Sequence, residues 1–211
     1  MSVYSPATTR KKPQNPCVVY SLGLQSQSSF EEALIWRTYC SILAVIEDGE
    51  AAEMGKQFPF LSREQQERVE FAWLQRGEEL SVRELMEGRG DTFVDVLRVS
   101  LSSAQENYEL LRALSEDFGG SIPIGQMVLR FEVHERNESE VESFLELVER
   151  LEEAGMRPVW SEARENDGTV AEVSFERFLF TFVFHTPVKE ADFVKYTFIN
   201  VRNADNKLLF E

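Results

Sequence analysis

Strand-like and helix-like segments alternate along most of this chain, and this alternation limits the folds that it can adopt. The segment "CVVYSLG" (17–23) is a short β-branched run that ends at a glycine, which is typical of a buried parallel strand meeting a turn. A helical pattern follows, with Phe30, Leu34 and Ile35 at helical spacing and Ser28 or Ser29 as the expected N-cap. Such repeated pairs predict βαβ units and a parallel sheet covered on both faces.

The same rhythm continues to about residue 160. Further strands are expected at 41–46, 68–74, 93–101, 125–134 and 156–162, and further helices at 62–68, 81–90, 104–120 and 138–155. Beyond Trp160 the pattern changes, because 172–185 and 194–203 both resemble strands and no helix is expected between them. The fold class predicted is therefore α/β, with a mostly parallel sheet that finishes in an antiparallel strand pair.

The length of 211 residues fits a single domain. Residues 1–16 are polar and contain three prolines, so we expect a flexible arm, followed by one domain over 17–211 with a strand-rich insert at 163–190. The arm lacks the apolar centre of a secretory signal, and no run approaches the roughly 18 apolar residues of a membrane helix. These features predict a cytoplasmic location.

Charge and cysteine content exclude several kinds of partner. The net charge of −15 argues against binding to nucleic acid or to anionic membranes, because both require a basic surface. A small molecule or a protein is the expected partner. Two cysteines and two histidines are too few for a disulfide scaffold or a His-rich centre, so no metal site is expected. Cys17 and Cys40 precede neighbouring strands and could form a disulfide, but without a secretory signal two buried thiols are favoured.

Several segments carry a resemblance to a known family. "CVVYSLGLQSQSSFEEAL" resembles the opening of a methyltransferase-domain family related to the methyltransferase-like 24 proteins, with Cys-Val-Val-Tyr-Ser, a glycine turn and then Ser-Phe-Glu at a helix start. Other segments that fit, in order, are "YC", "FVDVLRV", "IPIGQMVLRFEVH", "LEEAGMRPVW" and "YTFINVRN". The resemblance covers about Cys17 to Asn203. It implies a Rossmann-like, S-adenosylmethionine-dependent methyltransferase fold with helices on both faces of the sheet.

The chain departs from this family where the cofactor should bind. The resemblance implies an acid at the end of the second strand, where Ile46 stands and Glu47 follows. Because a one-residue slip reverses the face of a strand side chain, Glu47 would need a bulge or the start of a loop to serve. At the fourth strand the resemblance implies Leu-Lys-Ile-Asp-Ile-Glu-Gly-Ala-Glu. This chain has "LRVSLSSAQ" (97–105), so three negative charges are lost from the pocket rim.

These replacements predict that S-adenosylmethionine binding is weak or lost. A charge-assisted hydrogen bond contributes about 1.5–3 kcal/mol, and a serine hydroxyl cannot replace a carboxylate. The residues expected at the cofactor site are Ser21, Gly23, Gln25, Glu47, Ser100 and Ser102. Ser102 and Ser103 equally suit a structural role as N-caps of the following helix, and the two interpretations are compatible.

Catalytic chemistry, if present, would come from the end of the fifth strand. Glu132 and His134 are two residues apart and share one face, and His134 could act as a general base. The alternative is a hydrogen-bonded structural pair.

Two classes of function therefore remain. The favoured one is a methyltransferase-derived protein that no longer methylates, and that binds a partner or performs another reaction, such as that of a cyclase or isomerase. The other is an active methyltransferase with an altered pocket and His134 as base.

The Phe-rich segment 175–184 is the most distinctive remaining feature. Its phenylalanines at positions 175, 178, 180, 182 and 184 predict a strand with one very apolar face. We expect it to cover the core, with a homodimer or partner interface as the alternative.

Overall fold

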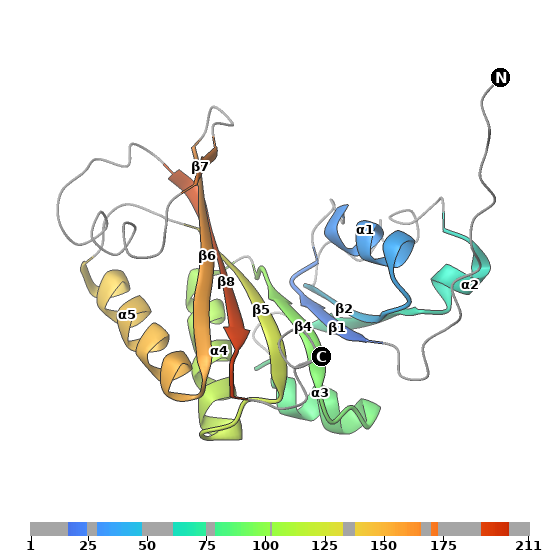
Figure 1. Ribbon diagram of the computed structural model, residues 1–211, viewed down its shortest axis with the longest axis horizontal. Helices are drawn as coiled ribbons and strands as arrows, with labels where there is room; N and C mark the ends of the chain where they lie inside the picture. The colour runs from blue at the N-terminus through green and yellow to red at the C-terminus, as the bar shows by residue number, and fades with distance from the viewer. Residues whose placement is uncertain are drawn as a thin grey trace.

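The computed structural model describes residues 17–24, 29–47, 61–74, 79–101, 103–132, 138–165, 170–172 and 191–202 (Figure 1). The strands are β1 (Val18–Leu22), β2 (Ser41–Glu47), β3 (Val69–Leu74), β4 (Val94–Val99), β5 (Ile124–Glu132), β6 (Met156–Glu165), β7 (Val170–Glu172) and β8 (Ala191–Asn200). The helices are α1 (Ser29–Arg37), α2 (Arg63–Gln66), α3 (Val82–Arg89), α4 (Ala104–Phe118) and α5 (Glu138–Glu153).

One sheet contains all eight strands, in the order β3-β2-β1-β4-β5-β8-β6-β7. The pairs β3–β2, β2–β1, β1–β4 and β4–β5 are parallel. Strand β8 runs antiparallel to both of its neighbours, β5 and β6, and β7 runs antiparallel to β6. The predicted α/β class and the antiparallel finish are confirmed. Of the strand predicted at 172–185, only Glu172 is described, in β7, and the Phe-rich segment 175–184 lies outside the described residues.

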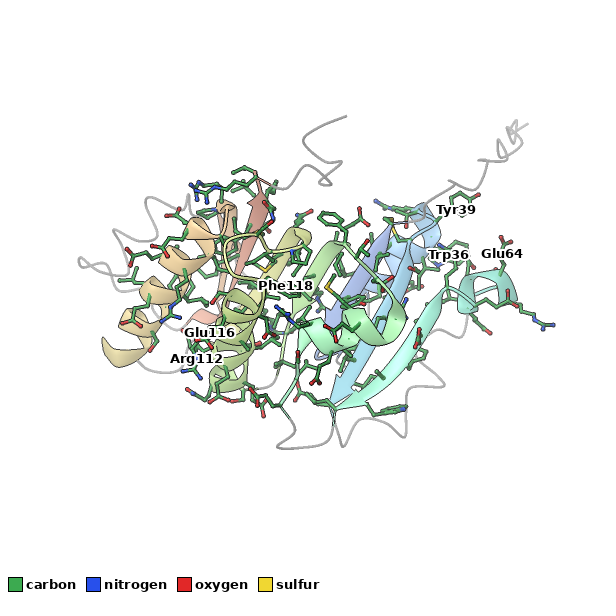
Figure 2. All side chains as sticks on the ribbon, turned by 90° about the horizontal axis from the view of Figure 1, so that it is seen from below. Trp36, Tyr39, Glu64, Arg112, Glu116 and Phe118 are labelled. Carbon is green, nitrogen blue, oxygen red and sulfur yellow. A yellow bond between two sulfur atoms is a disulfide. The ribbon has the colours of Figure 1, made fainter. Side chains whose placement is uncertain are left out.

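Helices cover both faces of the sheet. Helices α3, α4 and α5 pack against one face, and α1 packs against the other over β1 and β2 (Figure 1). Between α3 and α4, the Arg83 guanidinium lies 4.9 Å from the centroid of the Phe118 ring, which is labelled in Figure 2. On the same face the buried Tyr20 hydroxyl donates to Asp91 (2.8 Å), and burial together with this bond raises the pKa of Tyr20. Strands β1 and β2 are thus buried between two layers, as their apolar sequences predict, whereas β3 stays largely exposed.

The ends of α3 show why the helices stop where they do. Ser81 precedes the helix, and its side chain accepts a hydrogen bond from the Glu84 N–H. Gly90 follows the helix with φ +73°, the left-handed conformation that favours glycine, and its N–H bonds the last turn. No atom lies within 4 Å of the place where a Cβ on Gly90 would stand.

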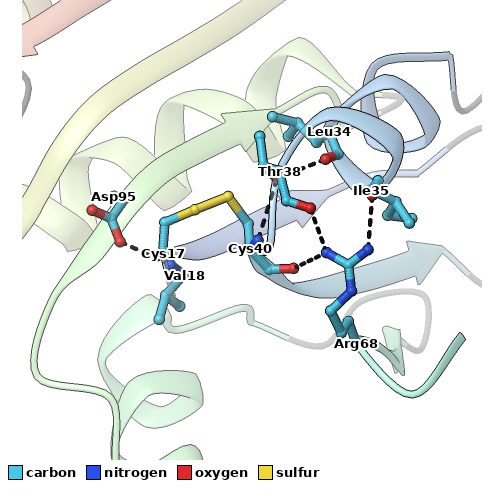
Figure 3. Close-up of a disulfide and its surroundings, with 8 residues drawn as sticks. All are labelled: Cys17, Val18, Leu34, Ile35, Thr38, Cys40, Arg68 and Asp95. Atoms are coloured by element: carbon cyan, nitrogen blue, oxygen red, sulfur yellow. Dashed lines mark hydrogen bonds between the residues drawn. A yellow bond between two sulfur atoms is a disulfide. The ribbon is translucent and has the colours of Figure 1, made fainter. Parts of the chain in front are cut away.

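A disulfide joins the chain at the amino-terminal ends of β1 and β2 (Figure 3). Cys17 and Cys40 have Cα atoms 4.4 Å apart, because the two strands are parallel neighbours and Cys40 comes directly before Ser41, the partner of Val18. The prediction of two free thiols is therefore wrong. The position of the two cysteines before neighbouring strands correctly predicted that they lie close together.

Arg68 fixes the loop that carries Cys40. Its guanidinium donates to the carbonyl oxygens of Ile35 (2.7 Å), Thr38 (2.8 Å) and Cys40 (3.3 Å), as Figure 3 shows. These carbonyls follow or end α1, where a helix leaves acceptors unpaired and where a cation is favourable.

Two further properties concern the described part of the chain alone. No helix in it is both long enough and apolar enough to cross a lipid bilayer. Among the same residues, no group of three or more histidine, cysteine or acidic side chains is placed to hold a metal ion.

The disulfide should contribute measurably to stability. It closes a loop with a sequence separation of 23 residues, and loops of this size give about 3 kcal/mol in the chain-entropy account. We expect the free energy of unfolding of the double variant Cys17→Ala/Cys40→Ala, measured with urea and without reductant, to be lower by that amount. Adding dithiothreitol should destabilise the unmodified protein and leave the variant unchanged. Equal urea midpoints for the two proteins without reductant would contradict the prediction.

Candidate functional site

The expected cofactor site lies at the carboxyl ends of β1, β2 and β4, where Gly23, Glu47 and Ser100 stand. The structure brings Ser21, Gly23 and Ser100 together, because β1 and β4 are neighbours. Gln25, Ser102 and His134 lie outside the described residues. Glu132 is the last residue of β5, and its backbone pairs with Phe193 in β8. Joint action of Glu132 and His134 stays a prediction.

Gly23 is required by packing within the sheet. Its φ is +76°, and a Cβ at this position would lie 2.4 Å from the Ser100 carbonyl oxygen and 2.7 Å from the Leu101 nitrogen. The N–H groups of Gly23 and Leu24 both donate to the Val45 carbonyl oxygen at 3.0 Å. The glycine therefore lets β1 pass close to the backbone after β4, and these two N–H groups already have a protein acceptor.

The backbone groups that follow β4 also have hydrogen-bond partners inside the protein. The Ser100 N–H donates to the Leu22 carbonyl oxygen (2.9 Å), and the serine is buried. The backbone of Leu101 exchanges two hydrogen bonds with the buried Asn107 side chain of α4 (3.2 and 3.3 Å). Ser103 caps α4 by accepting from the Glu106 N–H (3.4 Å), so its predicted capping role is confirmed.

A buried carboxylate, Glu31, lies under this site. It belongs to the first turn of α1, and its side chain is completely buried. Its Oε1 accepts hydrogen bonds from the Ser21 hydroxyl (2.5 Å) and from the Arg98 guanidinium (2.7 Å). Ser21 and Arg98 are register partners on β1 and β4, so both side chains face α1. The guanidinium also lies 5.7 Å from the centroid of the Phe30 ring.

Sequence reasoning missed Glu31, because an acid in the first turn of a helix is favourable in itself and requires no partner. Arg98 was the available signal. A charged side chain in the middle of a buried parallel strand requires a nearby carboxylate, because an unpaired charge is too costly to bury. That carboxylate belongs to the first turn of α1, the helix that covers this face of the sheet.

The second carboxylate oxygen of Glu31, Oε2, is buried without a hydrogen-bond partner. Arg98 therefore binds this carboxylate through one oxygen only. Buried acceptors are nearly always satisfied in native proteins, so an unsatisfied one calls for a structural or functional explanation. Chemically, Glu31 is able to accept one more donor, such as the N–H of a ligand.

Glu47 is the last residue of β2, and its backbone pairs regularly with β3. It lies opposite Leu74 of β3, and the pairing from Ile42 to Glu47 shows no shift in register. Its side chain is half-buried and belongs to the face of Leu43 and Val45, whereas Ile46 belongs to the face that α1 covers. The pairing from Ile42 to Glu47 contains no bulge, so Glu47 and Ile46 lie on opposite faces of the sheet. The expected role of Glu47 in cofactor binding stays a prediction.

Comparisons with known proteins show the fold. No protein-family model matches this chain, and no curated protein sequence matches it. Solved structures do match. The human methyltransferase 10 domain containing protein has a TM-score of 0.51 at 10% identity, over 88% of this chain and 71% of that one.

Two further structures are bound to the cofactor or its product. Streptococcus pneumoniae Sp1610 in complex with S-adenosyl-L-methionine has a TM-score of 0.51 at 12% identity, over 88% of this chain and 66% of that one. The N-terminal domain of human METTL16 in complex with SAH has a TM-score of 0.52 at 8% identity, over 87% and 60%. This chain has the S-adenosylmethionine-dependent methyltransferase fold. At identities this low, the comparison establishes the fold and does not establish an activity.

The contact between Gly23 and Ser100 gives a sharp test against a matched control. Gly23→Ala and Gly90→Ala both place a Cβ at positive φ, but only the first drives it into backbone atoms. We expect about 1 kcal/mol of destabilisation for Gly90→Ala and about 3 kcal/mol or more for Gly23→Ala, from urea unfolding. Equal losses would mean that β1 and β4 are not in close contact at this point.

The buried ion pair can be tested by a double-mutant cycle. Arg98→Met leaves the Glu31 carboxylate buried without its cation, and this should cost about 3–5 kcal/mol in the free energy of unfolding. Adding Glu31→Gln removes the stranded charge, so the double variant should be more stable than Arg98→Met alone. Arg63→Met is the control, because its pair with Glu67 is exposed and should contribute nothing measurable. A double variant no more stable than Arg98→Met would contradict the pairing.

Proposed function

We propose that this chain is a methyltransferase-fold protein with an eroded S-adenosylmethionine site, which no longer methylates and serves as a binding protein or a repurposed enzyme. One observation carries the proposal. The described polar groups at and near the ends of β1 and β4 already have partners inside the protein. Gly23 and Leu24 bond to Val45 of β2, Ser100 bonds to Leu22, and Ser21 and Arg98 bond to Glu31 of α1.

The sequence supports the same conclusion. Ser100 and Ser102 stand where the resemblance to the methyltransferase-like 24 proteins implies carboxylates, and Gln105 replaces a third. Among the described residues, the structure adds the buried carboxylate of Glu31, and this group is already neutralised by Arg98. A cofactor with a positively charged amino group would have to compete with a guanidinium that is part of the chain. Its expected affinity is correspondingly low.

An active methyltransferase is the second candidate, and Glu31 is the observation that favours it. Its unsatisfied Oε2 could accept a hydrogen bond from a bound ligand, so the site is not entirely without an acidic acceptor. In this case Gly23, Gln25 and Glu47 would complete the cofactor site, and His134 with Glu132 would remove the substrate proton.

The expected partners are a small molecule or a protein, since the charge of −15 disfavours nucleic acid and anionic membranes. The disulfide bears on location. Stable disulfides are rare in a reducing cytosol, so the Cys17–Cys40 bond favours an oxidising compartment over the predicted cytoplasm.

Calorimetric titration with S-adenosylmethionine and with S-adenosylhomocysteine separates the two candidates. The proposal expects no binding heat up to about 1 mM of either ligand, which is about −4 kcal/mol or weaker. Micromolar binding of either ligand, about −8 kcal/mol, would overturn it and support the second candidate. In that event Glu31→Gln, titrated in parallel, would show whether the buried carboxylate takes part.

A further inference from the structure

The Cys17–Cys40 disulfide joins two backbone segments that other groups also hold in place (Figure 3). On one side, the Cys17 carbonyl oxygen accepts a hydrogen bond from the Ser41 N–H of β2 (2.8 Å). The next residue, Val18, donates its N–H to the Asp95 carboxylate of β4 (2.8 Å). Cys17 is therefore tied to both strands that flank β1 by bonds that do not involve its sulfur atom.

Cys40 is held in a corresponding way at the end of the loop after α1. Its N–H donates to the Thr38 hydroxyl (3.2 Å), which donates in turn to the Leu34 carbonyl oxygen of α1 (2.6 Å). Its carbonyl oxygen accepts from the Arg68 guanidinium (3.3 Å), and the same guanidinium binds two further carbonyls at the end of α1. Because none of these contacts involves a sulfur atom, the two cysteines should stay adjacent when the disulfide is reduced.

The two cysteines differ in their access to solvent. Cys40 is 4% exposed, whereas Cys17 is partly exposed. In thiol–disulfide exchange an external thiolate must reach one sulfur, and the other sulfur leaves with a negative charge. Exposure selects Cys17 for attack. The Arg68 guanidinium, which is bonded to the Cys40 carbonyl oxygen, favours the negative charge on a departing Cys40 sulfur.

We propose that this disulfide is a reversible redox couple and that Cys17 is its site of exchange with low-molecular-weight thiols. The external thiolate forms a bond to the Cys17 sulfur, the bond between the two cysteines breaks, and Cys40 leaves as a thiolate that takes up a proton. A second thiolate then attacks the sulfur that the first one contributed and releases Cys17. In sum, two external thiols are oxidised to one disulfide, and the protein disulfide is reduced to two thiols.

A redox titration of the intact protein tests whether the fold holds the two thiols together. The protein is equilibrated with mixtures of reduced and oxidised glutathione, and the free thiols are alkylated and counted by mass spectrometry. Folding and disulfide formation favour each other by the same factor, which for a loop of this size is about 100-fold. The equilibrium constant for disulfide formation should therefore be about 100-fold larger in native buffer than in about 8 M urea. Equal constants would overturn the proposal.

Variants of the surrounding residues test whether the described contacts are responsible. Arg68→Met removes a charge-assisted hydrogen bond to Cys40 and should lower the native equilibrium constant about 10-fold. Thr38→Ala is a milder change that removes one neutral bond, and should lower the constant about threefold. Arg63→Met is the matched control, because its exposed pair with Glu67 should have no influence. An unchanged constant in Thr38→Ala and in Arg68→Met is incompatible with the proposal.

Single-cysteine variants identify the sulfur that exchanges. In Cys40→Ser, the remaining Cys17 thiol should form a mixed disulfide with oxidised glutathione at least about 10-fold faster than the Cys40 thiol does in Cys17→Ser, because Cys40 is buried. In about 8 M urea the two rates should become similar, since unfolding exposes both thiols. Equal rates in native buffer, or a faster reaction of Cys40, would show that Cys17 is not the site of exchange.

Discussion

The burial of β1 between β2 and β4 is the constraint on which the rest of this structure depends. Val19, Tyr20, Ser21 and Leu22 are all fully buried, so each face of the strand must be covered and each polar group must find a partner inside the protein. The ends of the strand are fixed as well. A disulfide holds one end to β2, and at the other end Gly23 passes against the backbone after β4.

This constraint explains where charge is found near the candidate site. Two serines and a glutamine stand where the resemblance implies acids at the rim. Beneath it, Glu31 and Arg98 place opposite charges in contact with Ser21. A buried ion pair of this kind adds little net stability compared with apolar residues, although breaking it is costly. Its hydrogen bonds hold α1 against β1 and β4.

The two ends of the parallel strands have separate roles. The amino-terminal ends hold the disulfide and the Arg68 contacts, which secure the loop between α1 and β2. The carboxyl ends hold the residues from which a methyltransferase would build its cofactor site. Reduction of the disulfide would therefore act on stability at the amino-terminal ends, away from the proposed site.

The sequence by itself determined the order and type of the elements. Periodicity, caps and glycines are local properties, and they predicted the parallel strands, the antiparallel finish at β8 and the capping role of Ser103. Boundaries moved by a few residues, as when the fourth strand ended at Val99 instead of at 101. The resemblance also predicted the methyltransferase fold correctly, because strand order and hydrophobic pattern survive after individual site residues change.

Only the tertiary structure decided which residues meet. Glu31 and Arg98 are 67 positions apart, so no local pattern reports their contact. The close approach of Gly23 to Ser100, the disulfide state of Cys17 and the face of Glu47 likewise depend on strand register and on packing between distant segments. The physical reason is that a side chain's charge partner and accessible space are set by its neighbours in three dimensions, whereas secondary structure is largely set by neighbours along the chain.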